Sequence, residues 1–154
     1  MRVLMVCLGN ICRSPIAEGI LRHKAAEKGL DIITDSAGTS AFHVGEAPDH
    51  RMILTAGKNG IDISDLSARQ FISADYQNFD LIYAMDESNY ENMIRLANND
   101  SDREKVRLIL NESTPGLNAS VPDPYYGGDQ GFQHVIDLLD VAVDKVIERI
   151  ETNG

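Results

Sequence analysis

A cysteine and an arginine six positions apart stand between an apolar run and a predicted helix. The apolar run over residues 3–6 ends at Cys7, and Arg13 comes just before Ser14, a residue type that often caps helices. A thiol at the end of a strand, facing the amino end of a helix, lies where a thiolate and a phosphate are both stabilised. The spacing predicts a loop that wraps one tetrahedral anion beside the Cys7 thiol.

The residues of this loop suit that chemistry. Gly9 and Asn10 are residue types that tolerate left-handed backbone, which turns several N–H groups inward toward an anion. Arg13 offers a planar fork that matches two phosphate oxygens. The loop contains no histidine, so we expect backbone N–H groups, the helix amino end and Arg13 to stabilise the thiolate.

Length, composition and charge restrict the class of protein. The chain has 154 residues and 43% hydrophobic content, which predicts one domain over 1–154. A net charge of −10 argues against nucleic acid or an anionic membrane as partner. The amino-terminal residues lack the features of a signal peptide, and two cysteines fit a reducing compartment, so we expect a cytoplasmic protein. The four histidines show no metal-ligand spacing, so we expect no metal site.

Strand and helix patterns alternate along the chain. This order favours an α/β fold in three layers, with a four-stranded parallel sheet, helices on both faces and the phosphate-binding loop after the first strand. We expect the first helix to start at Pro15, to be capped by Ser14 and to stop at Gly29. The other elements are strands over 2–6, 32–36, 81–84 and 106–110, and helices over 49–59, 86–97 and 132–151.

A stretch without periodicity, residues 111–131, separates the last strand from the last helix. Loops of this length in compact domains are often functional, and ligands of parallel sheets bind beyond the carboxyl ends of the strands. Asp123 stands here between two prolines, which restrict its backbone, and Tyr125 and Tyr126 follow. A carboxyl in this position could protonate a leaving group and later deprotonate water.

Residues 7–15, CLGNICRSP, resemble the phosphate-binding loop of the low-molecular-weight protein tyrosine phosphatases. The resemblance covers essentially the whole chain, because family-like segments follow in order at 35–40, 68–70, 85–89 and 123–127. It implies a hydrolase that needs no metal or cofactor and acts on phosphotyrosine in proteins or on small aryl phosphates.

The resemblance also implies a role for each matching residue. Cys7 would be the nucleophile that forms a phosphocysteine intermediate, and Asp123 the general acid. Ser14 would steady the thiolate, and Ser36 would be the side-chain partner of a strained Asn10. The phosphoryl oxygens would be bound by Arg13 and the loop amides, at Leu8, Gly9, Asn10, Ile11 and Cys12.

The remaining family positions concern the cleft and the second cysteine. Phe42, Tyr125 and Tyr126 would form aromatic walls around the phenyl ring of the substrate. Cys12 would form a reversible disulfide with Cys7, or would pack as a small buried residue beneath the loop. Both interpretations of Cys12 stay open.

Other functions are less consistent with these residues. A thioredoxin-coupled arsenate reductase needs further cysteines, and none follows Cys12. In protein-arginine phosphatases a threonine tends to replace Ile11 and the acid loop has fewer tyrosines. A phosphopeptide-binding module could dispense with Cys7 or Asp123, and a nucleotide site would need G-x-G-x-x-G, which the loop does not satisfy.

One position departs from the family. A histidine that braces the loop usually stands two residues before Ala68, and here Leu66 takes its place. We predict altered loop stability rather than lost activity, and Leu66→His should therefore change the unfolding midpoint or the turnover rate. A variant identical to wild type in both measurements would contradict the prediction.

Overall fold

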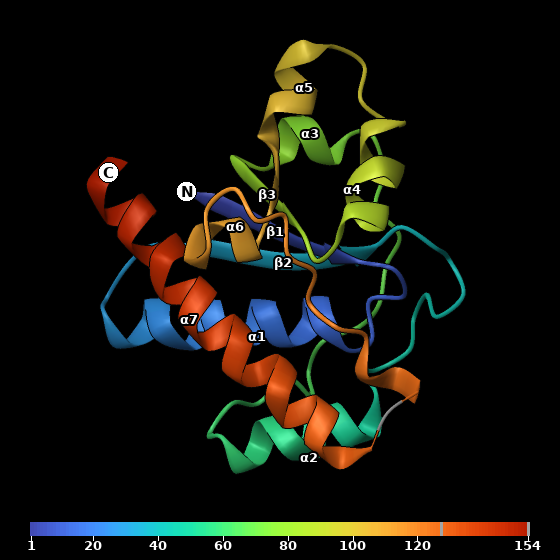
Figure 1. Cartoon of the computed structure of the whole chain (residues 1–154), viewed down its shortest axis with the longest axis vertical. Helices are drawn as coiled ribbons and strands as arrows, with labels where there is room; N and C mark the ends of the chain where they lie inside the picture. Colours follow the sequence, from blue (N-terminus) through green and yellow to red (C-terminus); the bar gives the residue numbers. More distant parts are fainter. Residues whose placement is uncertain (127, 154) are drawn as a thin grey trace.

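A parallel sheet of four strands forms the middle layer of the chain (Figure 1). The computed structural model describes residues 1–126 and 128–153, except for the side chains of Tyr126 and Asp129. The strand order is β2-β1-β3-β4, and all pairings are parallel, which confirms the predicted fold class. The strands are β1 (Arg2–Cys7), β2 (Ile33–Gly38), β3 (Leu81–Ala84) and β4 (Val106–Leu108).

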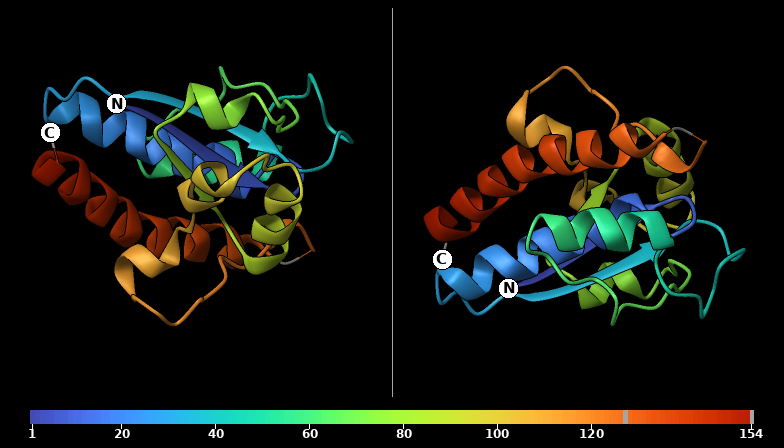
Figure 2. Two further views of the ribbon diagram at one scale, coloured as in Figure 1. Left: turned by 90° about the horizontal axis from the view of Figure 1, so that it is seen from above. Right: turned by 90° about the horizontal axis from the view of Figure 1, so that it is seen from below.

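Helices cover both faces of this sheet. Figure 1 shows α1, α2 and α7 on one side and α3, α4 and α5 on the other. In both views of Figure 2 the two chain ends lie together, away from the end at which β1 enters α1. The helices are α1 (Arg13–Glu27), α2 (His50–Lys58), α3 (Asp75–Asn78), α4 (Glu87–Ile94), α5 (Asp100–Lys105), α6 (Leu110–Ser113), the 3₁₀ turn η1 (Pro124–Tyr126) and α7 (Asp129–Asn153).

The central strand β1 divides the core into two parts. Val3 and Met5 belong to the cluster that includes α1 and α7, whereas Leu4 and Val6 belong to the cluster that includes Phe71 and α3. Successive strand residues point to opposite faces, so a strand buried on both faces must be apolar throughout. This requirement explains the apolar run that ends at Cys7.

The first helix begins two residues earlier than predicted. Arg13 already belongs to α1, and the residue at the cap position is Cys12, which makes no side-chain capping bond. The Ser14 hydroxyl therefore does not cap the helix, because it is bonded inside the Cys7 loop instead. Gly29 follows the helix with a φ of 64°, as expected for a glycine that ends a helix.

The long stretch 111–131 is more structured than predicted. β4 already ends at Leu108, α6 begins at Leu110, the turn η1 follows Asp123, and α7 begins at Asp129 rather than at 132. Helices α3, α5 and α6 have only four to six residues each. Such short helices lack the several turns that a periodic apolar pattern needs.

The carboxyl end of β2 lies directly against the Cys7 loop. The N–H groups of Thr39 and Ser40 donate to the carbonyls of Cys7 and Leu8, both at 2.9 Å. A Cβ atom at Gly38 would lie 2.8 Å from the Leu8 carbonyl oxygen, closer than real Cβ contacts allow. The loop can therefore approach β2 only because residue 38 has no side chain.

We expect Gly38→Ala to destabilise the protein by about 1–3 kcal/mol, because overpacking against rigid backbone forces the loop to shift. The measurement is the free energy of unfolding in urea. Gly57→Ala in α2 is the matched control, because a Cβ there meets no atom within 4 Å. The control should be neutral or gain up to about 1 kcal/mol from helix propensity. Equal effects of the two substitutions would contradict the prediction.

Candidate active site

A cavity of about 290 Å³ opens beside the carboxyl end of β1. It brings together Cys7, Arg13 and Asp123, the three residues predicted to do chemistry, although Asp123 is more than a hundred positions from the other two. Leu8, Gly9, Ile11 and Cys12 of the loop also line the cavity. It is thus bounded by a thiol, a guanidinium and a carboxyl.

The Cys7 sulfur lies within a small network of donors. The backbone N–H of Asn10 donates to it at 3.2 Å, and the Ser14 hydroxyl lies 3.0 Å away. The Asn10 side-chain amide donates to the Ser14 oxygen at 2.8 Å, which directs the Ser14 proton toward the sulfur. Donors of this kind favour the thiolate, the reactive form of cysteine.

Asn10 holds the loop in its turned conformation. Its φ is 58°, in the left-handed region, and its side-chain oxygen accepts from the Arg69 N–H at 3.0 Å. The prediction of left-handed backbone is confirmed for Asn10 but is wrong for Gly9, which does not have a positive φ. Gly9 serves close packing instead, because a Cβ there would lie 3.1 Å from the His43 ring.

Ser36 has a different partner from the one predicted. Its hydroxyl donates to the Glu18 carboxylate oxygen at 2.7 Å. The side chain of Asn10 is bonded to Ser14 and to the Arg69 backbone instead. Burial raises the pKa of Glu18, and the Ser36 hydrogen bond offsets this effect only in part.

Arg13 is a buried cation whose guanidinium is held by a carboxylate and a backbone carbonyl. One guanidinium nitrogen donates to Asp86 at 2.7 Å and to the Val121 carbonyl at 3.0 Å. The other oxygen of Asp86 accepts from the N–H of Asn89 at 2.7 Å and caps α4. Asp86 therefore has two tasks, and sequence reasoning identified only the helix start.

Asp123 stands opposite the loop at the cavity wall. Its Oδ1 accepts from the Tyr125 N–H at 3.0 Å, so the carboxyl is oriented by its own turn. Its Oδ2 lies 3.9 Å from the second terminal nitrogen of Arg13. The carboxyl is partly exposed and close to the anion site, which suits an acid that delivers a proton to a leaving group.

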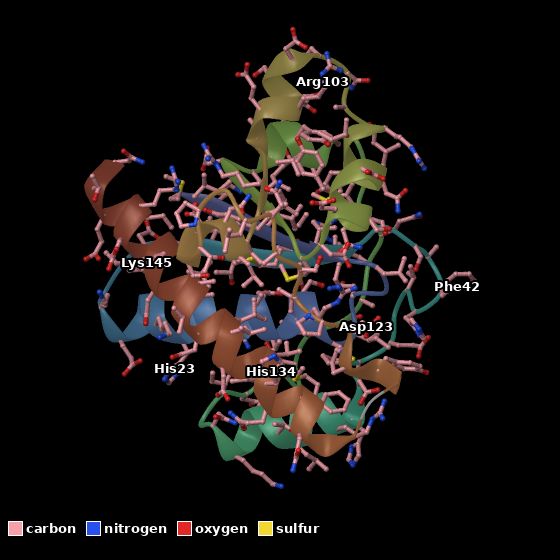
Figure 3. All side chains as sticks on the ribbon, in the orientation of Figure 1. His23, Phe42, Arg103, Asp123, His134 and Lys145 are labelled. Atoms are coloured by element: carbon pink, nitrogen blue, oxygen red, sulfur yellow. The ribbon has the colours of Figure 1, made fainter. Side chains whose placement is uncertain are left out.

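Two of the three predicted aromatic walls can be placed. Phe42 belongs to the lining of the cavity, although it is 87% exposed and, in Figure 3, projects outward from the loop after β2. Tyr125 lines the cavity, while the side chain of Tyr126 lies outside the described part of the chain. Ser40 and His43 also line the cavity, and the sequence analysis assigned a role to neither.

A chain of contacts joins the Cys7 loop to the segment around Asp123 through the start of α2. The N–H of Asp49 donates to the Ile11 carbonyl at 2.7 Å, and the Asp49 carboxylate pairs with Arg51 at 3.1 Å. Arg51 donates to the Tyr125 carbonyl at 2.9 Å. Its guanidinium carbon also lies 4.7 Å from the centre of the Phe132 ring, on which it stacks. Both sides of the cavity are thus attached to one helix end.

Cys12 is buried and Leu66 packs against the core. Burial raises the pKa of the Cys12 thiol, and the nearby acid Asp49 raises it further, so this thiol stays protonated. Leu66 packs against the main core cluster. Arg69 supports the loop through its backbone N–H, which donates to the Asn10 side chain, and its guanidinium bonds both Asp35 and Asp75.

Two findings concern metals and membranes. In residues 1–126 and 128–153, no three His, Cys, Asp or Glu side chains are grouped so as to hold a metal ion. No helix of the same residues combines the length and apolarity that crossing a bilayer requires.

Comparison with known proteins supports the family resemblance found in the sequence. The sequence pattern of the low molecular weight phosphotyrosine protein phosphatases matches residues 2–154. A Schizosaccharomyces pombe protein of that description is 47% identical over 145 residues, which cover 92% of each chain. The structure of a protein tyrosine phosphatase from Entamoeba histolytica has a TM-score of 0.93, 38% identity and coverage of 99% of this chain and 98% of its own. A Drosophila arginine phosphatase has a TM-score of 0.91 at 29% identity, with full coverage of both chains.

The Asp86–Arg13 pair gives a prediction about anion binding. We expect Asp86→Ala to weaken the binding of inorganic phosphate at least tenfold and to lower the free energy of unfolding by about 3 kcal/mol, because it leaves a buried cation unpaired. Titration calorimetry and urea unfolding measure the two effects. Asp100→Ala, which breaks an exposed pair with Arg103, should change neither by more than about 1 kcal/mol. Equal losses in the two variants would contradict the prediction.

Proposed function

This chain belongs to the low molecular weight phosphotyrosine protein phosphatase family, and we propose that it hydrolyses phosphotyrosine through a phosphocysteine intermediate. The observation that carries the proposal is the meeting of Cys7, Arg13 and Asp123 in one cavity. A phosphatase of this kind needs a nucleophile, a cation for the phosphoryl oxygens and an acid for the leaving group. Each of the three residues supplies one of these.

In the first step, the Cys7 thiolate attacks phosphorus and the bond to the phenolic oxygen breaks. Arg13 and the N–H groups of the loop stabilise the charge on the three equatorial oxygens. Asp123 gives its proton to the departing oxygen, which leaves as the neutral phenol. The products of this step are a phosphocysteine at residue 7 and an ionised Asp123.

In the second step, Asp123 removes a proton from a water molecule that attacks phosphorus. The bond between sulfur and phosphorus breaks, inorganic phosphate is formed, and the Cys7 thiolate returns. The donors from Asn10 and Ser14 stabilise this thiolate as a leaving group. The carboxyl thus ends each cycle protonated, ready for the next substrate.

The form of the cavity supports an aryl substrate. Phe42 and Tyr125 line it together with Ile11, so a phenyl ring would lie between apolar walls above the loop. The likeness to a Drosophila arginine phosphatase makes phosphoarginine the second candidate substrate. Ile11 and the two adjacent tyrosines favour phosphotyrosine.

The proposal includes the setting in which this chemistry takes place. Both cysteines are free thiols, and a thiolate nucleophile persists best where thiols are kept reduced. We therefore propose a cytoplasmic enzyme whose single catalytic domain spans residues 1–154. Its partners are phosphotyrosine-containing proteins or small aryl phosphates.

The test is hydrolysis of aryl phosphates in the presence of a metal chelator. Cys7→Ser should lower kcat to below about a thousandth of the wild-type value, because the hydroxyl is a much weaker nucleophile. Asp123→Ala should lower kcat by about 10²–10⁴-fold on phosphotyrosine, and by less on nitrophenyl phosphate, whose leaving group needs less help from an acid. Asp31→Ala, an exposed acid that does not line the cavity, is the control.

Unchanged turnover in Cys7→Ser would overturn the mechanism, and inhibition by the chelator would overturn its independence of metal. Phosphotyrosine and phosphoarginine peptides of one sequence, assayed side by side, decide the substrate. Faster hydrolysis of the phosphoarginine peptide would replace the proposed substrate and leave the roles of Cys7 and Arg13 in place.

A further inference from the structure

A buried carboxyl that the mechanism does not use belongs to α1, the helix that follows the Cys7 loop. Glu18 is only 5% exposed, on the face of α1 that packs toward β2. Within the described residues, no arginine, lysine or histidine forms an ion pair with it. Its strong hydrogen bond comes from the neutral Ser36 hydroxyl, itself buried. A buried carboxylate without a cation is costly, and protonation relieves that cost.

Two connections link Glu18 to the Cys7 loop. It follows Ser14 by four residues in α1, so the two side chains lie one turn apart on the same face. Its partner Ser36 precedes Ala37, whose carbonyl lies 3.4 Å from the Ser14 hydroxyl. That same hydroxyl is 3.0 Å from the Cys7 sulfur. The carboxyl is therefore linked to the thiol through Ser36, the Ala37 carbonyl and the Ser14 hydroxyl.

The charged groups around Glu18 do not compensate an ionised carboxylate. Asp35 of β2 and Asp65 of the loop after α2 are acids, and they oppose its ionisation. Arg22, one turn further along α1, favours ionisation but is already paired with Asp65 at 2.9 Å. Arg69 is bonded to Asp35 and Asp75. An anion in the Cys7 loop would add one more negative group to this set.

We propose that Glu18 is a positioning residue of the anion site: its carboxyl stays protonated while the Cys7 loop holds a phosphoryl group, and its ionisation weakens the binding of that group. The coupling is reciprocal, so phosphate binding draws a proton onto Glu18. The inference rests on the proposed function only in that the Cys7 loop binds a phosphoryl anion.

The test compares the affinity for inorganic phosphate in wild type and in Glu18→Gln between pH about 5 and about 9. Glutamine keeps the shape and the acceptor of the protonated acid and cannot ionise. Phosphate titrates identically with both proteins, so the ratio of the two dissociation constants isolates the effect of residue 18. We expect a ratio near one at the acidic end that rises on the order of tenfold in favour of Glu18→Gln at the alkaline end.

Two further variants separate this coupling from a structural effect. Glu27→Gln, an exposed glutamate on the same helix, should follow wild type at every pH. Ser36→Ala removes the hydroxyl that favours the ionised carboxylate, so tight phosphate binding should persist to higher pH than in wild type. This second variant keeps the proposal testable if Glu18→Gln fails to fold.

A merely structural role would give a different result. A ratio that is constant with pH, whether at one or at another value, would overturn the proposal and leave the phosphatase function intact. Loss of phosphate binding in wild type at every pH would instead count against the proposed function. Calorimetry in two buffers of different ionisation enthalpy adds an independent readout. Within the pH range over which the ratio of dissociation constants changes, wild type should take up more protons than Glu18→Gln when phosphate binds, and equal uptake would contradict the coupling.

Discussion

The buried guanidinium of Arg13 is the group around which the site is arranged. A cation that is only 4% exposed needs partners on its inner side if it is to bind an anion on its outer side. Asp86 and the Val121 carbonyl supply these partners, one from the turn between β3 and α4 and the other from the segment that leads to Asp123. One charge thereby determines where three separate parts of the chain meet. The parallel sheet makes this possible, because the ends of β1 and β3 are paired neighbours.

The same logic governs the position of negative charge. The chain carries 24 acidic and 14 basic residues. Its anion site must nevertheless avoid repelling the thiolate and the phosphate. Around the loop, acids are paired with arginines: Asp49 with Arg51, and Asp35 with Arg69. Within the described residues Glu18 has no such partner, and its hydrogen bond comes from the neutral Ser36 hydroxyl. Asp49 and Asp35 can thus lie near the cavity because a neighbouring arginine compensates the charge of each carboxylate.

The sequence predicts the parts of this site that depend on residue type and local spacing. The apolar pattern and turn chemistry predict Cys7 at a strand end and Arg13 in a loop before a helix, although that helix in fact begins at Arg13, and the four strands follow from the alternation of strand and helix patterns. The partners that lie across the fold do not follow. An aspartate before a helix predicts a cap, so the second task of Asp86, holding Arg13, has no signal of its own. Ser36 bonds Glu18 rather than Asn10, because a choice between two nearby partners depends on side-chain geometry that only the packed structure defines.

The attachment of both loops to the start of α2 determines how wide the cavity can become. Asp49 is bonded to Ile11 on one side, and Arg51 is bonded to Tyr125 on the other, so the walls move apart only if these contacts break or the helix itself shifts. Arg51 also stacks on Phe132 of α7, which opposes such a shift. The spacing of the two cavity walls is therefore held by the packing of one helix end, as well as by the loops that line the cavity.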